Sequence, residues 1–131
     1  MAGLLIVAHA PLASTLKAVA AHVFPGESRL AALDVASDAS PETLATVARE
    51  LAAQVRDPDL LVLTDAFGGT PCNVALKLAD DAQVRVVAGV NVPMLWRALG
   101  YRHLPLNELT ERAVAGGIQG VMQLPTTRPE G

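Results

Sequence analysis

The sequence contains few aromatic residues, one cysteine and no cluster of basic residues. Aromatic residues make up 3% of the 131-residue chain and hydrophobic residues 51%, so its core must be built mainly from Ala, Val and Leu. The single cysteine, Cys72, excludes a disulfide within the chain, and the three scattered histidines give no metal-binding motif. A net charge of −3 without a Lys/Arg block argues against nucleic-acid binding. We therefore expect no metal, no cofactor and no nucleic-acid partner.

Long hydrophobic runs and nucleotide-binding motifs are also missing. No stretch approaches the roughly 20 apolar residues that cross a bilayer, and the first hydrophobic run is too short for the core of a signal peptide. We expect a cytoplasmic protein that does not insert into the membrane. No P-loop motif follows a hydrophobic run, and no Gly-x-Gly-x-x-Gly follows the first one. Any phosphate donor is therefore expected to be another protein.

Four short hydrophobic runs alternate with segments of helical spacing. The runs are residues 4–7, 30–35, 60–63 and 84–87. This alternation predicts an α/β fold, with a doubly wound, mostly parallel open sheet of strand order 2-1-3-4 and helices on both faces. We assign residues 1–124 to a single domain and residues 125–131 to a flexible tail.

Capping residues mark where several helices begin. Ser40 followed by Pro41 is a typical helix start, and Asn91 can cap the helix after the fourth strand. The first helix should end at Pro25-Gly26. It is expected to pack through one apolar stripe, made of Leu12, Leu16, Val19, Ala20 and Val23.

The C-terminal part reads as a helix followed by a strand. Leu106, Leu109 and Ala113 indicate a last helix that should end before Gly116-Gly117. Residues 118–124 are mostly apolar and are expected to form a final strand.

His9 and Asp65 are the candidate catalytic residues in this alternation of strands and helices. His9 follows the first predicted strand and Asp65 follows the third. In a sheet of order 2-1-3-4 these two strands are neighbours, and ligands bind at the carboxyl ends of the strands where strand order reverses. A carboxylate bonded to one ring nitrogen fixes the tautomer and leaves the other nitrogen free to attack phosphorus. His9 is therefore predicted to be a phosphorylated nucleophile, oriented by Asp65.

A phosphoryl group on His9 would need hydrogen-bond donors for its oxygens. We expect them from Ala10, at the start of the helix opened by Pro11, and from the loop of Gly68, Gly69 and Thr70, since helix starts and glycine loops present free N–H groups. Thr70 has a second interpretation of equal weight, as the cap of a helix that begins at Pro71. Asp65 can likewise be read as a loop cap.

Three segments resemble one known family, the mannose-type IIA domains of the bacterial phosphoenolpyruvate-dependent sugar phosphotransferase system (PTS). The segments are residues 4–9, 63–73 and 88–95, and the middle one, with its Asp-x-x-Gly-Gly-Thr-Pro motif, is the most specific. The resemblance covers nearly the whole chain. Two positions depart from the usual pattern: Ala10 stands where the family more often has glycine or a polar residue, and Thr70 stands where serine is common.

The resemblance implies a set of partners. His9 would be phosphorylated by the phosphocarrier HPr and would pass the group to a IIB protein, with Asp65 as the family's histidine-orienting aspartate. The family forms homodimers by exchanging a final strand, which would fall in residues 118–124 here. A stand-alone IIA protein of this kind would serve sugar uptake or report phosphorylation state, and contact with membrane permease subunits is left open.

Three other functions are alternatives for this pattern. The first is a phosphoryl donor subunit of a dihydroxyacetone kinase system, whose middle loop should differ from the one present. The second is a receiver-like module phosphorylated on Asp65, which would need a pair of acids after the first strand to hold Mg²⁺. The third is a regulatory binding module without phosphotransfer, which the sequence leaves open.

Overall fold

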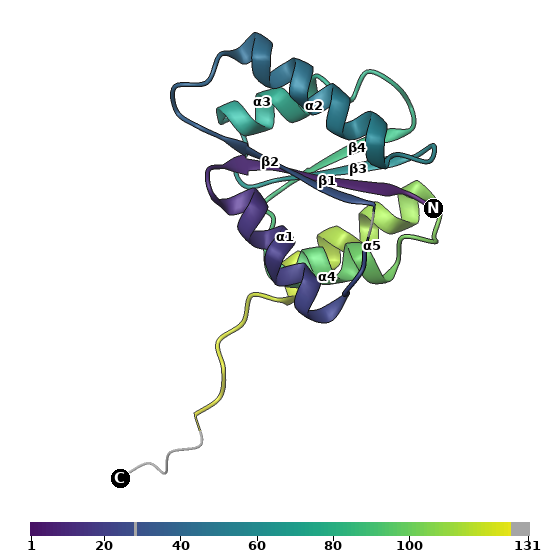
Figure 1. The fold of residues 1–131 in the computed structure, drawn as a ribbon. Coiled ribbons are helices and arrows are strands. Elements are labelled where there is room, and N and C mark those ends of the chain that lie inside the picture. Colours follow the sequence, from purple (N-terminus) through teal and green to yellow (C-terminus); the bar gives the residue numbers. More distant parts are fainter. Residues whose placement is uncertain (28, 127–131) are drawn as a thin grey trace.

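The computed structural model describes residues 1–27 and 29–126, and its centre is a four-stranded parallel sheet (Figure 1). The strands lie in the order β2-β1-β3-β4, as predicted. Their bounds are β1 (Gly3–His9), β2 (Leu30–Val35), β3 (Leu60–Thr64) and β4 (Val84–Ala88). All pairs are parallel, with Val7 opposite Thr64 in the β1–β3 pair. The carboxyl ends of all four strands therefore meet at one edge of the sheet, the carboxyl edge.

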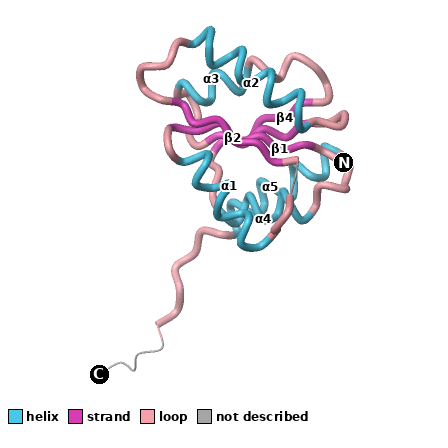
Figure 2. Tube along the Cα trace, in the orientation of Figure 1, coloured by secondary structure: helices cyan, strands magenta, loops and turns pink. Residues whose placement is uncertain are grey.

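Helices cover both faces of the sheet. Their bounds are α1 (Leu12–Val23), α2 (Pro41–Val55), α3 (Thr70–Leu76), α4 (Val92–Gly100) and α5 (Leu106–Gln119). Figure 2 shows α2 and α3 on one side of the strands and α1, α4 and α5 on the other. Alternate residues of β1 point to opposite faces: Leu4 and Ile6 pack with α1, α4 and α5, whereas Leu5 and Val7 pack with α2 and α3. The central strands β1 and β3 are thus buried on both faces, which explains their continuous hydrophobic sequence.

Two of the predicted helix caps are confirmed, and the predicted stripe of α1 is partly wrong. The Ser40 hydroxyl accepts a hydrogen bond from the Thr43 amide, and the Asn91 side chain accepts one from the Met94 amide at 2.9 Å. In α1, however, Leu12 and Val23 are exposed. The helix packs into the core through a narrower strip of Ala13, Leu16 and Ala20.

The prediction that Gly116-Gly117 ends the last helix is wrong, since α5 continues to Gln119. Both glycines are buried where α5 crosses α4. A methyl group on Gly116 would overlap the Arg97 side chain, and one on Gly117 would lie 2.7 Å from the Met94 side chain. The absence of a side chain therefore serves close helix packing here, and the tertiary contact outweighs the low helix propensity of glycine.

Residues 118–124 form no strand in this single chain. Ile118 and Gln119 belong to α5, and residues 121–126 are exposed and have no regular structure. Figure 1 shows this segment leaving the body of the domain. A strand needs a neighbouring edge to bond to, and within the described residues this segment has none. Of the predicted tail, residues 127–131 lie outside the described residues.

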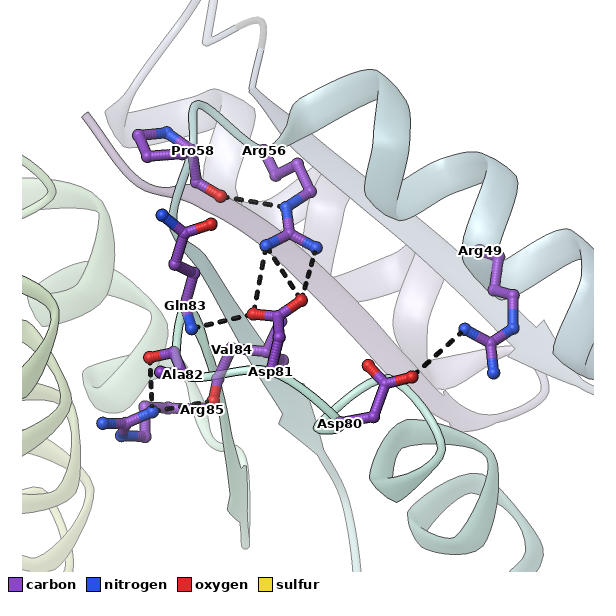
Figure 3. Close-up of polar contacts among 9 residues, drawn as sticks. All are labelled: Arg49, Arg56, Pro58, Asp80, Asp81, Ala82, Gln83, Val84 and Arg85. Atoms are coloured by element: carbon purple, nitrogen blue, oxygen red, sulfur yellow. Dashed lines mark hydrogen bonds and ion pairs between the residues drawn. The ribbon is translucent and has the colours of Figure 1, made fainter.

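The edge opposite the carboxyl edge is held by charged pairs. Arg56, after α2, bonds to the Asp81 carboxylate at 3.3 Å and to the Pro58 carbonyl at 2.9 Å. Arg49 lies 3.9 Å from Asp80 (Figure 3). The hydrogen bond from Arg56 lowers the pKa of Asp81. These contacts link α2 to the loop before β4, far from the residues predicted to carry chemistry.

Candidate functional site

His9 and Asp65 meet at the carboxyl edge, as the strand order requires. His9 ends β1 and Asp65 directly follows β3, and these two strands are paired. The Nδ1 atom of His9 lies 2.8 Å from Asp65 Oδ2, and the same oxygen accepts a hydrogen bond from the His9 backbone amide at 3.0 Å. The His9 side chain is 59% exposed, whereas the Asp65 side chain is only 15% exposed. The imidazole is therefore anchored on one nitrogen and open to solvent.

Hydrogen bonds hold the Asp65 side chain in its ionised form. Partial burial acts to raise the pKa of Asp65, but hydrogen bonds from the His9 amide, the His9 ring and the Ala66 amide outweigh it and lower the pKa below its ordinary value. The Ala66 amide donates to Oδ1 at 2.9 Å. The backbone is also braced, because the Gly89 amide donates to the Asp65 carbonyl at 3.1 Å. With the carboxylate ionised, Nδ1 of His9 carries the ring proton that lies between them.

The glycine loop lies beside the free side of the imidazole. Gly68 has φ +90°, a conformation that residues with a side chain rarely adopt, and it turns the chain from Asp65 toward α3. A methyl group on Gly69 would lie 3.4 Å from Cε1 and 3.8 Å from Nε2 of His9. Gly69 therefore lies beside Nε2 of His9.

The capping interpretation of Thr70 is wrong. The residue that caps α3 is Gly69, and Thr70 is the first residue of the helix, followed by Pro71. No side-chain hydrogen bond caps α3. Thr70 is exposed and lines a cleft together with His9.

The imidazole opens into a cleft of about 280 Å³, the His9 cleft. Residues between β2 and α2 form one wall of this cleft. Ser37, in this wall, is a hydroxyl donor that the sequence analysis did not single out. It follows β2 by two positions, so the rule that sites form at the carboxyl ends of strands would have included it. The full lining is His9, Val35, Ala36, Ser37, Ala39, Pro41 and Thr70.

The structure contradicts the predicted role of Ala10 and of the start of α1. The Ala10 amide donates to the Val35 carbonyl at 3.0 Å, so it is already used in strand pairing. The first turn of α1 is occupied by Asp34, whose carboxylate accepts hydrogen bonds from the Ser14 amide at 3.0 Å and from the Ser14 hydroxyl. The Ser14 hydroxyl is the main cause of the lowered pKa of Asp34. A protein carboxylate therefore fills the anion position at this helix start.

The alternation of strand residues explains this error. Asp34 and α1 lie on one face of the sheet, whereas the His9 side chain points into the cleft on the face of α2 and α3. The start of α1 is close to His9 in sequence but lies on the other side of the sheet. In the described part of the chain, no three His, Cys, Asp or Glu side chains gather to hold a metal ion.

The chain is similar to known proteins of one family. The family model described as "EIIA-man: PTS system fructose IIA component" matches residues 3–114. The fructose-specific EIIA component of the PTS of Bacillus subtilis (strain 168) is 31% identical over 112 residues, which cover 83% of this chain and 77% of that protein. The mannose-specific EIIAB component of Escherichia coli (strain K12) is 40% identical over 68 residues, which cover 50% of this chain and 21% of that protein.

A solved structure supports the same fold. The mannose/sorbose-specific IIA subunit of the phosphotransferase system from Enterococcus faecalis matches with a TM-score of 0.87 at 23% identity, and the match covers 98% of both chains. In the described residues, no helix is both long and apolar enough to span a membrane. Because the family match includes both strands that carry His9 and Asp65 and most of the remaining chain, this protein belongs to the EIIA-man family of phosphotransferase-system IIA components.

Proposed function

We propose that this protein carries a phosphoryl group on Nε2 of His9, received from phosphorylated HPr and passed to a IIB protein. The family to which the chain belongs supports a phosphoryl-carrier role in a sugar phosphotransferase system. The observation that carries the assignment to His9 is the 2.8 Å contact between its Nδ1 and Asp65 Oδ2. It leaves Nε2 exposed in the cleft while the opposite nitrogen is fixed.

The tautomer follows from the state of Asp65. An ionised carboxylate can only accept hydrogen bonds, so Nδ1 must donate and Nε2 keeps its lone pair. In the reaction this lone pair forms the new N–P bond. The bond between phosphorus and the donor protein breaks, and its electron pair stays with the donor. The Nδ1 proton remains in place, and Asp65 stabilises the positive charge that develops on the ring.

Groups at the cleft are suited to receive the phosphoryl oxygens. The backbone of Gly69 borders Nε2, and Thr70 and Ser37, which carry hydroxyls, line the same cleft. Backbone N–H groups and hydroxyls are neutral donors, so they can bind the group without holding it too tightly for onward transfer. No metal or cofactor enters this scheme.

A homodimer is part of the proposal. Residues 121–126 leave the domain in an exposed, irregular segment that contains Val121, Met122 and Leu124, all exposed. Exposed apolar residues of this kind are typical of a segment that another chain covers. We infer that the segment is exchanged between two copies and adds a strand to the partner, as the resemblance implied.

The test is phosphorylation of the purified protein. It is incubated with phosphoenolpyruvate, enzyme I and HPr, and the product is examined for a phosphate that is labile in acid and stable in base. Label on the wild-type protein and none on His9→Ala is the expected result. Label that persists in His9→Ala would overturn the assignment, and an unlabelled wild-type protein would favour a regulatory binding module.

A further inference from the structure

We propose that Phe67 is the docking anchor for the phosphocarrier proteins that exchange the phosphoryl group with His9, and that these partners present an apolar hollow bordered by Lys or Arg. The inference rests on the proposed function and deepens it, because it names the surface that recognises the partner. Its basis is the exposure of one aromatic side chain beside a cleft that has no cation of its own.

Phe67 is unusually exposed for its type. Its side chain is 86% exposed, the largest value among the large hydrophobic residues that the structure describes. It lies between Asp65, whose backbone and side chain are held by hydrogen bonds, and Gly68, which turns the loop. After Gly68 the chain is held again at Gly69, whose carbonyl accepts a hydrogen bond from the Asn73 amide at 3.0 Å. The ring is therefore presented between two hydrogen-bonded positions of the loop. Aromatic side chains on fixed positions are the residues that most often carry binding energy in protein interfaces.

A partner that docks over His9 with an interface of ordinary size also reaches this ring. Phe67 precedes Gly69 by two residues, a backbone span of at most about 7 Å. A methyl group on Gly69 would be 3.8 Å from Nε2, so Phe67 lies close to the reacting nitrogen. A specific interface buries about 800 Å² on each protein, equivalent to a disc of about 16 Å radius. A disc of that size centred on Nε2 includes Phe67.

The charge around the cleft indicates the chemistry of the partner. The segments that follow the four strands contain no Lys or Arg, and Asp38 and Glu42 are exposed in one of them. The segments are residues 8–14, 35–42, 64–73 and 88–93. A phosphoryl group in transfer carries negative charge that cations normally stabilise. None of these segments offers a cation, although Lys77, directly after α3, acts on Glu42 from outside them. A partner that carries Lys or Arg would supply the missing positive charge and would be complementary to the acidic rim.

The experiment measures phosphorylation of full-length protein by phosphorylated HPr at increasing HPr concentration. Phe67→Ala should raise KM for phospho-HPr roughly 10- to 100-fold and change kcat by less than about twofold. Phe67→Trp should keep most of the wild-type affinity. Phe67→Lys should raise KM more than Phe67→Glu does, because the lysine repels a cationic partner.

Two controls separate docking from chemistry. Val23→Ala removes an exposed apolar side chain at the far end of α1 and should leave KM unchanged. Phosphoramidate is a donor too small to dock on Phe67; its P–N bond breaks, ammonia leaves and the phosphoryl group joins Nε2. Phe67→Ala should be labelled by it at the wild-type rate.

Four results would contradict the proposal. An unchanged KM in Phe67→Ala would refute docking, and so would an equal loss with phospho-HPr and phosphoramidate, which would mean that Phe67 only shapes the loop. A larger loss in Phe67→Glu than in Phe67→Lys would refute the cationic partner. In each of these cases the wild-type protein is still labelled on His9 and the proposed function stands. A wild-type protein that neither donor labels would refute both proposals together.

Discussion

Replacing Asp65 tests how the carboxylate controls the reactivity of His9. Its Oδ2 accepts N–H groups from the His9 amide and ring, and its Oδ1 accepts the Ala66 amide. In Asp65→Asn, an NH₂ group replaces one of the two carboxylate oxygens. This group would then face an N–H group that had donated a hydrogen bond to that oxygen. If the NH₂ group faces the ring, Nδ1 must accept, the ring proton moves to Nε2, and the nucleophilic lone pair is lost. Asp65→Ala removes the charge without forcing this tautomer.

The size of the effect follows from the separation of 2.8 Å between Nδ1 and Oδ2. Two unit charges at this distance attract by about 6 kcal/mol at a dielectric constant of 20 and by about 1.5 kcal/mol at 80. Because 59% of the His9 side chain is exposed, water screens the pair strongly. We therefore take the stabilisation of the charged ring by Asp65 as about 1.5–3 kcal/mol. Its loss in Asp65→Ala corresponds to a transfer rate roughly 10- to 100-fold lower. The tautomer change should make Asp65→Asn slower still.

The assay is single-turnover transfer from phosphorylated HPr, followed by rapid quenching. Asp80→Asn is the matched control, since it removes one carboxylate charge at the opposite edge of the sheet, and it should transfer at the wild-type rate. Thermal unfolding of each variant checks that the fold persists. Wild-type rates in both Asp65 variants would refute the orienting role, and a slower Asp65→Ala than Asp65→Asn would refute the tautomer argument.

Three further predictions concern the loop, the acid response and the sheet. Gly69→Ala should fold normally but be phosphorylated at least about tenfold more slowly, because its methyl group contacts the imidazole beside Nε2; normal rates in the same assay would contradict this. The lowered pKa of Asp65 means that its ionised form stabilises the fold above the ordinary carboxyl pKa, and that this contribution is lost as the pH falls through the lowered value. Urea unfolding at neutral and acid pH should therefore show a smaller acid loss in Asp65→Asn than in wild type, and equal losses would argue against it. In Gly3→Ala the new methyl group would overlap the Val55 carbonyl, so the free energy of unfolding should fall by about 1–3 kcal/mol, measured by chemical denaturation. An unchanged value would mean that the end of α2 can move away at little cost.

The sequence by itself determined the sheet and the pairing at its centre. A strand that is buried on both faces appears in the sequence as a short continuous hydrophobic run. Right-handed crossovers between such strands leave few strand orders to consider. Once β1 and β3 are neighbours, His9 and Asp65 must share the carboxyl edge, because His9 ends β1 and Asp65 directly follows β3. The helix starts at Ser40 and Asn91 were predictable for a similar reason, since a cap is a local hydrogen bond.

Only the tertiary structure decided which groups face the imidazole. The alternation of side chains along β1 places His9 on the face of α2 and α3, so the start of α1 lies on the other face and takes the Asp34 carboxylate instead. The same holds for Gly116, which sequence rules assign to a helix end and which packing against α4 retains inside α5. The exposure of Phe67 in the loop was not predicted from the sequence either. Local sequence patterns indicate hydrogen bonds and periodicity along the chain. Which groups lie opposite one another, how helices pack and which side chains are exposed depend on residues that are distant in sequence.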